Sequence, residues 1–521
     1  NGCRVLGIDV DSGKCALARQ FGAETVDLSN NEDPISKANV FSRGHGVDAV
    51  IITASTKSSA PVSQAAIMCR KRGRVVLVGV VGLELSREDF YGKEISFQVS
   101  CSYGPGRYDS AYEEKGNDYP IGFVRWTEQR NFEAVLDLMA SGALDVKPLI
   151  SHRFEIENAV EAYKCLGDRS SLGIILNYSN DANGLLSNKV VSITPQKTYS
   201  TTDVVCGFVG GGNYASRVLI PAFKDAGAEL NTLLTSGGVS AVHHGKKNGF
   251  IHASTDLNQL LANESINTVV IATQHNLHAS QVVECLKAGK HVFVEKPLAL
   301  SHEELDAIQT AYEDAKMSCL MVGYNRRFAP HIIKMKELLS QVSEPKTFIM
   351  TMNAGEIPAD HWTQDSLLGG GRIIGEACHY IDLMRHLAGC KITGFSAMCL
   401  GKSPGVATVE DKATITISFE DGSIGTIHYF ANGGKAFAKE RIEVFANNAV
   451  LQLDNFRKLH GYGWPGFKKM NLWKQDKGQK NCSQAFVDAV ASGYEPPIPV
   501  DQIFEVAKVS IQAAEMLRKQ S

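Results

Sequence analysis

The chain has 521 residues, of which 44% are hydrophobic and 21% are charged, and its formal net charge at pH 7 is −3. These values are typical of folded globular chains and exclude a disordered or fibrous protein. The near balance of charge also argues against a nucleic-acid partner, which usually needs a strong basic excess. Because no stretch of about 18 uncharged apolar residues occurs, we expect no membrane-spanning segment.

Cysteine usage points to a reducing compartment. The 12 cysteines are scattered through apolar segments, and no pair has C-x-x-C spacing. Such residues usually act as small hydrophobes, so we predict free thiols, a cytoplasmic location and no metal site. The chain begins with Asn1 instead of Met and runs straight into an apolar strand pattern, which indicates a trimmed N-terminus.

The first part of the chain, residues 1–178, alternates apolar runs with helical patterns. This alternation predicts a parallel, doubly wound sheet of the Rossmann type. The expected strands are 5–10, 49–53, 74–80, 95–101, 145–150 and 173–176, and the expected helices are 12–21, 61–70 and 159–166.

A polar break at 179–202 is the best candidate for a linker. Strand–helix alternation restarts at Asp203 and predicts a second Rossmann-like parallel sheet over 203–325. From 326 to 521 helices mix with alternating strands, and Asp421-Gly422 is a hairpin signal. We therefore predict an α/β protein with two Rossmann-like sheets, followed by an α+β domain with a mainly antiparallel open sheet.

The strongest motif follows the strand-like run 204–209. Gly210-Gly211-Gly212-Asn213-Tyr214-Ala215 has the G-x-G-x-x-A pattern between a strand and a helix. The first glycine permits the tight turn, the second lets a pyrophosphate approach the backbone, and the small third residue lets the helix pack on the strand. The free N–H groups of the helix start favour an anion. The motif predicts NAD or NADP binding.

The end of the next strand does not decide between the two cofactors. An acid usually binds the ribose hydroxyls there, but this chain has Thr235 and Ser236. These hydroxyls would suit a 2′-phosphate, with Lys246 or Lys247 as counter-charge, or they are ordinary turn formers.

Two more strand ends carry polar residues. Thr273, His275 and His278 follow the strand-like run 268–272, and Glu295-Lys296 follows 291–294. Ligands of open α/β sheets bind at these carboxyl ends, so the first group would contact cofactor or substrate, while a metal pair at the two histidines and helix-capping polar residues are the alternatives. A lysine beside a nicotinamide could transfer a proton to or from an oxygen, although a solvated ion pair is an equal alternative.

In combination these motifs resemble the glucose-fructose oxidoreductase / inositol dehydrogenase (Gfo/Idh/MocA) family over about 203–515. The resemblance rests on the glycine motif, on Ala288-Gly289-Lys290-His291-Val292 with Glu295-Lys296-Pro297, on Gly323–Phe328 and on Gly369–Asp382. It implies a dinucleotide-binding domain and a C-terminal domain that binds substrate and supports homo-oligomers. It also implies cofactor contacts at Glu295, Lys296, Asn325 and Arg326.

The resemblance implies that Lys296 contacts nicotinamide and substrate, and that His379 is the acid/base, with Asp382 on the same helix face. Many members carry Asp four residues before that histidine, where this chain has Gly375. Either Glu376 substitutes from a shifted position, or Lys296 and His379 work without this carboxylate. His275 stands where Asn is common.

Residues 1–178 resemble the cofactor domain of zinc-type, medium-chain alcohol dehydrogenases. The resemblance implies that Asp9 binds an adenosine ribose, and that the glycine-rich turn and zinc-bearing domain would precede residue 1. A solvated acid at a strand end is the alternative for Asp9.

The sequence thus predicts an NAD(P)-dependent oxidoreductase of a sugar or sugar nucleotide, with a role in polysaccharide biosynthesis by analogy. Its catalytic residues would be Lys296, His379, Glu376 and Asp382. A non-catalytic dinucleotide-binding regulator and zinc-type dehydrogenase chemistry from the first part are the alternatives. His361-Trp362 and Trp464-Pro465 would line a sugar pocket or pack locally.

Overall fold

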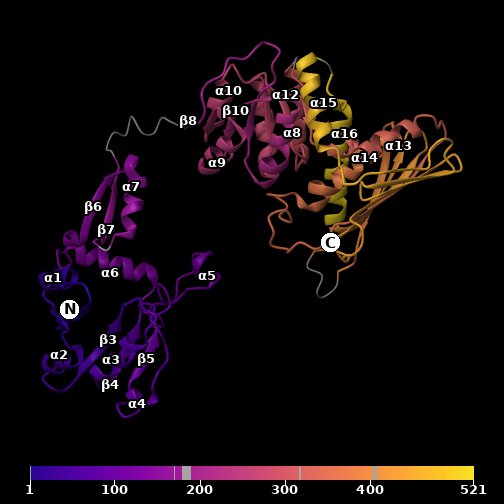
Figure 1. Cartoon of the computed structure of the whole chain (residues 1–521). Coiled ribbons are helices and arrows are strands. Elements are labelled where there is room, and N and C mark those ends of the chain that lie inside the picture. The colour runs from indigo at the N-terminus through magenta and orange to yellow at the C-terminus, as the bar shows by residue number, and fades with distance from the viewer. Residues whose placement is uncertain are drawn as a thin grey trace. The chain divides into compact units, whose positions relative to one another are not determined.

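The computed structural model describes residues 2–168, 170–178, 189–315, 318–402, 408–493 and 495–520. The chain forms two compact units, 1–182 and 183–521, which we treat separately (Figure 1). The two domains expected at 203–325 and 326–521 therefore lie in one unit. No helix among the described residues is long and apolar enough to cross a membrane.

The first unit contains parallel strands, as expected, but they form three small sheets. The sheets are β1 (Leu6–Asp9) with β2 (Glu24–Asp27), β3 (Val47–Ile52) with β4 (Cys69–Leu77) and β5 (Ser96–Val99), and β6 (Ile150–Glu155) with β7 (Gly173–Asn177). The helices are α1 (Ser12–Gln20), α2 (Pro34–Phe41), α3 (Ala60–Met68), α4 (Arg87–Tyr91), α5 (Ser110–Glu113), α6 (Glu128–Ala140) and α7 (Ala159–Lys164).

Two details of this unit differ from the sequence expectations. The strand expected at 145–150 is wrong, because Lys147–Leu149 forms a 3-10 turn with proline near its start, and β6 begins only at Ile150. Strand β2 was not expected. Asp9 ends β1, where its carboxylate accepts a hydrogen bond from the N–H of Asp11 at 2.9 Å.

The second unit begins inside the segment expected as a linker. Residues 179–188 of that segment lie outside the described residues, but Val190–Ser192 forms strand β8, which pairs antiparallel with β11 (His252–Ser254). An edge strand of only three residues gives a weak sequence signal, and its side chains are half-buried or exposed because it covers the sheet edge without entering the core.

The main sheet of this unit has the order β14-β13-β12-β9-β10-β11-β8. All neighbours except β8 are parallel, so the strand order reverses between β9 (Val205–Val209) and β12 (Thr268–Ile271). Ligands of such sheets bind at this switch point, beyond the carboxyl ends of the strands. The remaining elements are β10 (Glu229–Leu234), β13 (His291–Val294), β14 (Leu320–Val322), α8 (Ile220–Asp225), α9 (Val239–Asn248), α10 (Leu257–Ala262), α11 (His278–Lys287) and α12 (His302–Asp314).

A second, eight-stranded sheet has the order β16-β17-β18-β15-β19-β20-β21-β22 and is antiparallel except between β15 and β18. One residue in two along β17 and β18 is buried, which matches the expected open sheet with one covered face. Its strands are β15 (Thr347–Asn353), β16 (Ile392–Cys399), β17 (Lys412–Phe419), β18 (Ile424–Phe430), β19 (Glu440–Ala446), β20 (Ala449–Asp454), β21 (Lys458–Tyr462) and β22 (Lys469–Asn471).

Helices connect the two sheets of the second unit. These helices are α13 (Pro330–Leu339), α14 (Cys378–Ala388), α15 (Gln479–Ser492) and α16 (Val500–Arg518). Figure 1 shows α15 beside α8, and Phe486 of α15 lies edge-on to Phe223 and Phe293, with ring centroids 6.1 and 5.5 Å apart. This shared aromatic core explains why 183–521 forms a single unit.

Candidate active site

The glycine-rich turn after β9 leaves room for a ligand to approach the backbone. Gly210 has φ of 104°, and a Cβ there would lie 2.4 Å from the carbonyl oxygen of Ala272, so a side chain is excluded on both counts. A Cβ on Gly212 would meet nothing within 4 Å. The protein therefore leaves open space at Gly212, as a pyrophosphate cradle requires.

The helix that follows the turn begins as the motif predicts. Asn213 and Tyr214 form its exposed first turn, and Ala215 is 1% exposed, which allows close packing on the sheet. The helix continues as a π-helical turn over Ala215–Leu219 before α8. Such widened turns are frequent at functional sites. The geometry of all these residues fits a dinucleotide phosphate.

The hydroxyl residues at the end of β10 differ in their surroundings. The hydroxyl of Thr235 is buried and accepts hydrogen bonds from the N–H of Gly238 at 3.2 Å and from the hydroxyl of Ser240 at 3.1 Å. Ser236 is exposed. Lys246 and Lys247 belong to the last turn of α9, whereas Thr235 precedes its first turn, so this arrangement favours the alternative of ordinary turn formers.

His278 and Thr273 make hydrogen-bond contacts within the protein at the end of β12. The His278 ring is fully buried, with Nδ1 2.7 Å from the carbonyl oxygen of Pro297 and Nε2 3.2 Å from that of Thr273. Burial lowers the pKa of His278 to about 4. The Thr273 hydroxyl donates to Gln281 at 2.7 Å. The expected cofactor contact of His278 is therefore wrong, because its ring braces the β12 and β13 ends.

His275 lies against the position that departs from the family pattern. Its Nδ1 lies 2.8 Å from the carbonyl oxygen of Gly369, and its ring centroid is 4.9 Å from that of Trp362. A Cβ on Gly375 would lie 3.1 Å from Cε1 of His275. Burial lowers the pKa of His275 to about 3, so the ring is neutral. Since Nδ1 must donate to a carbonyl, Nε2 carries the lone pair.

Lys296 reaches from the end of β13 to the second half of the unit. Its Nζ donates to the carbonyl oxygen of Gly375 at 2.7 Å. The preceding Glu295 is close to Tyr214 and Arg326, and burial raises its pKa to about 7 although Lys296 and Arg326 oppose the rise. The two residues of the Glu-Lys pair thus occupy different environments.

His379 is the buried histidine of this site. It lies in the first turn of α14, directly after the π-helical turn Ile373–Ala377, and is 5% exposed. Its Nδ1 has no hydrogen-bond partner among the described residues. Burial lowers the pKa of His379 far below its usual value, and Arg326 and Lys296 add to this effect. The structure therefore brings a neutral His379 close to Lys296.

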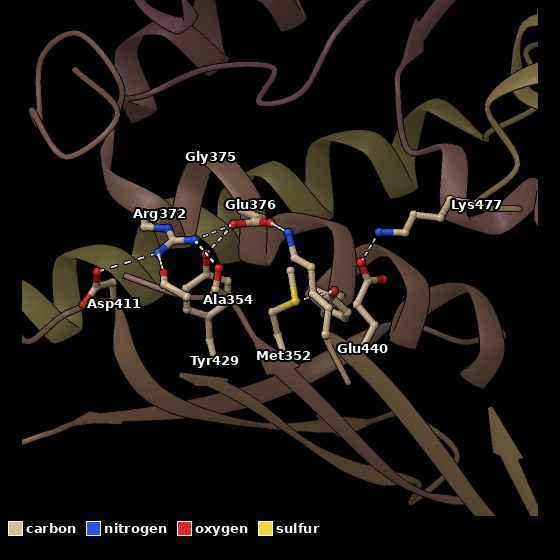
Figure 2. Close-up of polar contacts among 12 residues, drawn as sticks. Met352, Ala354, Arg372, Gly375, Glu376, Asp411, Tyr429, Glu440 and Lys477 are labelled. Carbon is tan, nitrogen blue, oxygen red and sulfur yellow. Dashed lines mark hydrogen bonds and ion pairs between the residues drawn. The ribbon is translucent and has the colours of Figure 1, made fainter. Parts of the chain in front are cut away.

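Glu376 is held by other groups (Figure 2). Its carboxylate accepts hydrogen bonds from Tyr429 at 2.5 Å, Arg372 at 3.1 Å and Lys439 at 3.3 Å. Burial alone would raise its pKa, but Lys439, Tyr429 and Arg372 outweigh burial and lower the pKa to about 2. Glu376 therefore stays ionised, acts on Lys296 through its charge, and does not replace the missing aspartate by a hydrogen bond.

The expectation that Asp382 orients Lys296 or His379 is wrong. Both oxygens of Asp382 accept hydrogen bonds from Arg327, at 2.8 and 2.9 Å, and both side chains are buried. Arg327 also donates to Gln502 on α16 at 2.6 Å. The carboxylate is three residues from His379 but is committed to this buried ion pair.

Asn325 and Arg326, expected at the cofactor, contact the C-terminal part instead. Asn325 donates to the carbonyl oxygen of Lys477 at 2.6 Å, and Arg326 pairs with Glu440 at 3.2 Å. Lys477 also pairs with Glu440, at 2.5 Å (Figure 2). Glu440 could not be predicted from the pattern around Arg326, because it lies on β19 of the other sheet, 114 residues along the chain.

Zinc chemistry finds no support in the donor set. Within the described ranges, no group of three or more His, Cys, Asp and Glu side chains could hold a metal ion.

The fold and site define a nicotinamide-dinucleotide-dependent oxidoreductase. Residues 204–324 match the model of an oxidoreductase family with an NAD-binding Rossmann fold, residues 333–452 match the GFO/IDH/MocA C-terminal domain, and residues 1–115 match a zinc-binding dehydrogenase domain.

Comparison with known proteins agrees with this class. A 4-carboxy-2-hydroxymuconate-6-semialdehyde dehydrogenase of Sphingobium sp. is 30% identical over 60% of this chain and 98% of its own length. A myo-inositol 2-dehydrogenase of Thermotoga maritima is 27% identical over 41% of this chain and 64% of its own. The solved structure of levoglucosan dehydrogenase with NADH and levoglucosan has a TM-score of 0.55 and 21% identity, over 61% of this chain and 98% of that chain. The chain belongs to the Gfo/Idh/MocA family of NAD(P)-dependent dehydrogenases.

Proposed function

We propose that residues 203–325 bind NAD(P) and residues 326–521 bind a sugar, polyol or sugar nucleotide, whose secondary hydroxyl is oxidised at the interface of the two. The observation that carries the proposal is the position of Lys296, whose Nζ donates to the carbonyl oxygen of Gly375, four residues before His379, and is close enough to act on the charge of that ring. Myo-inositol 2-dehydrogenase and levoglucosan dehydrogenase, by their names, act on compounds of this class.

The cofactor supplies the hydride acceptor, nicotinamide C4. In the oxidation, the carbon–hydrogen bond breaks with its electron pair, the oxygen–hydrogen bond releases a proton, and a carbonyl forms. Lys296 donates a hydrogen bond to the hydroxyl oxygen and stabilises the negative charge that develops there. His379 is neutral, so a lone pair of its ring is available to accept the proton. Trp362, packed on His275, supplies an apolar face for a sugar ring.

Two measurements on the purified full chain test this function. Titration with NADH and NADPH, followed by nicotinamide fluorescence, should show saturable binding. Incubation with NAD⁺ or NADP⁺ and a panel of sugars, cyclitols and sugar nucleotides should produce reduced cofactor with at least one of them. Absence of binding by both cofactors would refute the proposal.

A non-catalytic regulator is the second candidate. Gly375, which replaces the aspartate common in the family, is the observation that favours it. Saturable cofactor binding with no turnover of any panel compound would support the regulator over the enzyme.

The exposed face of the second sheet and the free cysteines bear on the assembly and location of the protein. The open face of the second sheet exposes Phe430, Phe445 and Tyr462, at 37%, 41% and 55%, and we expect homo-oligomers to cover this apolar surface. All cysteines are free thiols, which suits a reducing cytoplasm. A role in polysaccharide biosynthesis would follow if a sugar nucleotide proved to be the substrate. Light scattering of the wild type and of Phe445→Glu tests the oligomer.

A further inference from the structure

Cationic side chains surround the ring of His379. Arg326, Lys296, Lys477 and Lys439 are all close enough to act on the charge of this ring. They come from distant parts of the chain: the ends of β13 and β14, the start of β19, and the loop before α15. Folding therefore concentrates positive charge at this point, which costs free energy unless something opposes it.

The neighbouring carboxylates are too few to balance these cations. Glu440 is shared by Arg326 at 3.2 Å and Lys477 at 2.5 Å. Glu376 is likewise shared by Arg372 at 3.1 Å and Lys439 at 3.3 Å. Each carboxylate thus faces two cations. Lys296, by contrast, donates its hydrogen bond within the described structure to a neutral group, the carbonyl oxygen of Gly375.

Other acids nearby do not remove this excess. Asp411 is 2.7 Å from Lys412 and 4.0 Å from Arg372, so its charge is already matched. Asp382 is taken by Arg327. Glu295 is protonated in part at neutral pH, because burial raises its pKa to about 7. Among the described residues, positive charge therefore remains uncompensated beside His379.

A second observation independently indicates a ligand at this place. The Nδ1 atom of His379 is buried and lacks a hydrogen-bond partner in the described structure, although the residue is only 5% exposed. Buried polar atoms nearly always have a partner, and a ligand beside the ring is one way to supply it. The side chains of Lys439 and Lys477 are 46% and 19% exposed, so both remain accessible to a ligand.

We propose that the substrate carries an anionic group, a carboxylate or a phosphate, which binds at Lys439 and Lys477 while its hydroxyl lies at Lys296 and His379. This inference rests on the proposed function and specifies its substrate class. An anion restores the charge balance, and its oxygens accept charge-assisted hydrogen bonds from both lysines. A neutral sugar offers hydroxyls but leaves the excess charge in place.

Binding to the full chain tests the inference separately from turnover. The probes are D-galactose, D-galacturonate and D-galactose 6-phosphate, measured by calorimetry with and without saturating NADH. We expect at least one anionic probe to bind about tenfold or more tightly than galactose, the equivalent of one charge-assisted hydrogen bond. Preference for galacturonate identifies a carboxylate, and preference for the phosphate ester identifies a phosphate.

Lysine variants test whether Lys439 supplies the positive charge that binds the anion. Lys439→Gln should reduce the preference of the anionic probe over galactose about tenfold, whereas Lys469→Gln should leave it unchanged. Lys469 is an exposed lysine on β22, at the far edge of the same sheet. Salt dependence of wild-type binding provides a check that needs no variant, since the anion preference should fall as ionic strength rises.

Any of three results would overturn the inference. Galactose binds as tightly as the anionic probes or more tightly, no probe binds, or the anion preference changes neither with ionic strength nor in Lys439→Gln. Two other results would count against the proposed oxidation and not against the anion site. They are the failure of the wild-type chain to bind NADH, and binding of an anionic probe without turnover of any compound.

Discussion

Lys296 Nζ donates a hydrogen bond to the carbonyl oxygen of Gly375 at 2.7 Å. This contact joins the end of β13 in the nucleotide-binding sheet to the π-helical turn that precedes His379. Because the widened turn presents a backbone carbonyl to Lys296, the amine is positioned without the carboxylate that the family pattern would supply at residue 375.

His275 and Gly375 should behave as a coupled pair. A Cβ on Gly375 would lie 3.1 Å from His275 Cε1, so Gly375→Asp should crowd the ring and lower the free energy of unfolding. In combination with His275→Asn, a smaller side chain, the destabilisation should fall below the sum of the single changes by about 1 kcal/mol. A double-mutant cycle of denaturant unfolding measures this coupling, and strict additivity would disprove the contact.

Two glycines of the phosphate turn should respond differently to alanine. Gly212→Ala adds a methyl group in open space, so it should leave Tm unchanged but weaken NADH binding about tenfold or more, because the backbone approach is lost. Gly210→Ala forces a Cβ to 2.4 Å from the Ala272 carbonyl oxygen and should lower Tm as well. Thermal unfolding and fluorescence titration separate the two effects.

Gly122→Ala is the matched control, since its Cβ would also meet nothing within 4 Å and it lies in the first unit. Unaltered NADH affinity of Gly212→Ala would show that the cofactor phosphates bind elsewhere.

Asp382 should matter for stability and not for the proton. Replacement by alanine leaves Arg327 buried without its partner, so Asp382→Ala should lower the free energy of unfolding by about 3–5 kcal/mol. Asp306→Ala, at an exposed position on α12, should have little effect. The shape of the pH–rate profile of residual folded enzyme should match the wild type. A shifted pH–rate profile at unchanged stability would show that Asp382 takes part in proton transfer.

Glu295 should make stability depend on pH. Its folded-state pKa is raised from 4.5 to about 7, so the folded protein holds more protons than the unfolded chain between these values. Its contribution is therefore fully present below about pH 4.5 and is lost as the pH rises through about 7. Removing the charge by Glu295→Gln should flatten this part of the stability–pH curve.

Chemical denaturation of wild type, Glu295→Gln and the exposed control Glu284→Gln across this range measures the effect. The prediction fails if the wild type and Glu295→Gln lose stability in parallel.

Patterns local in sequence were predictable. The strand–turn–helix context of Gly210–Ala215 predicted the open turn, and alternation along 412–419 predicted a one-sided sheet. Contacts between distant segments were not predictable in this way. Asp382 is one helical turn from His379, but a partner 55 residues away binds it. The cations around His379 likewise meet only after the two sheets are joined through α8 and α15.

The most direct test of the central claim is the Lys296→Ala variant of the full chain. We predict that turnover of a substrate found in the panel falls about 10²–10⁴-fold, while the dissociation constant for NADH changes little. The exposed control Lys287→Ala should match the wild type in both. Turnover by Lys296→Ala at the wild-type rate, with NADH still bound, would contradict the assignment of Lys296 to the hydroxyl.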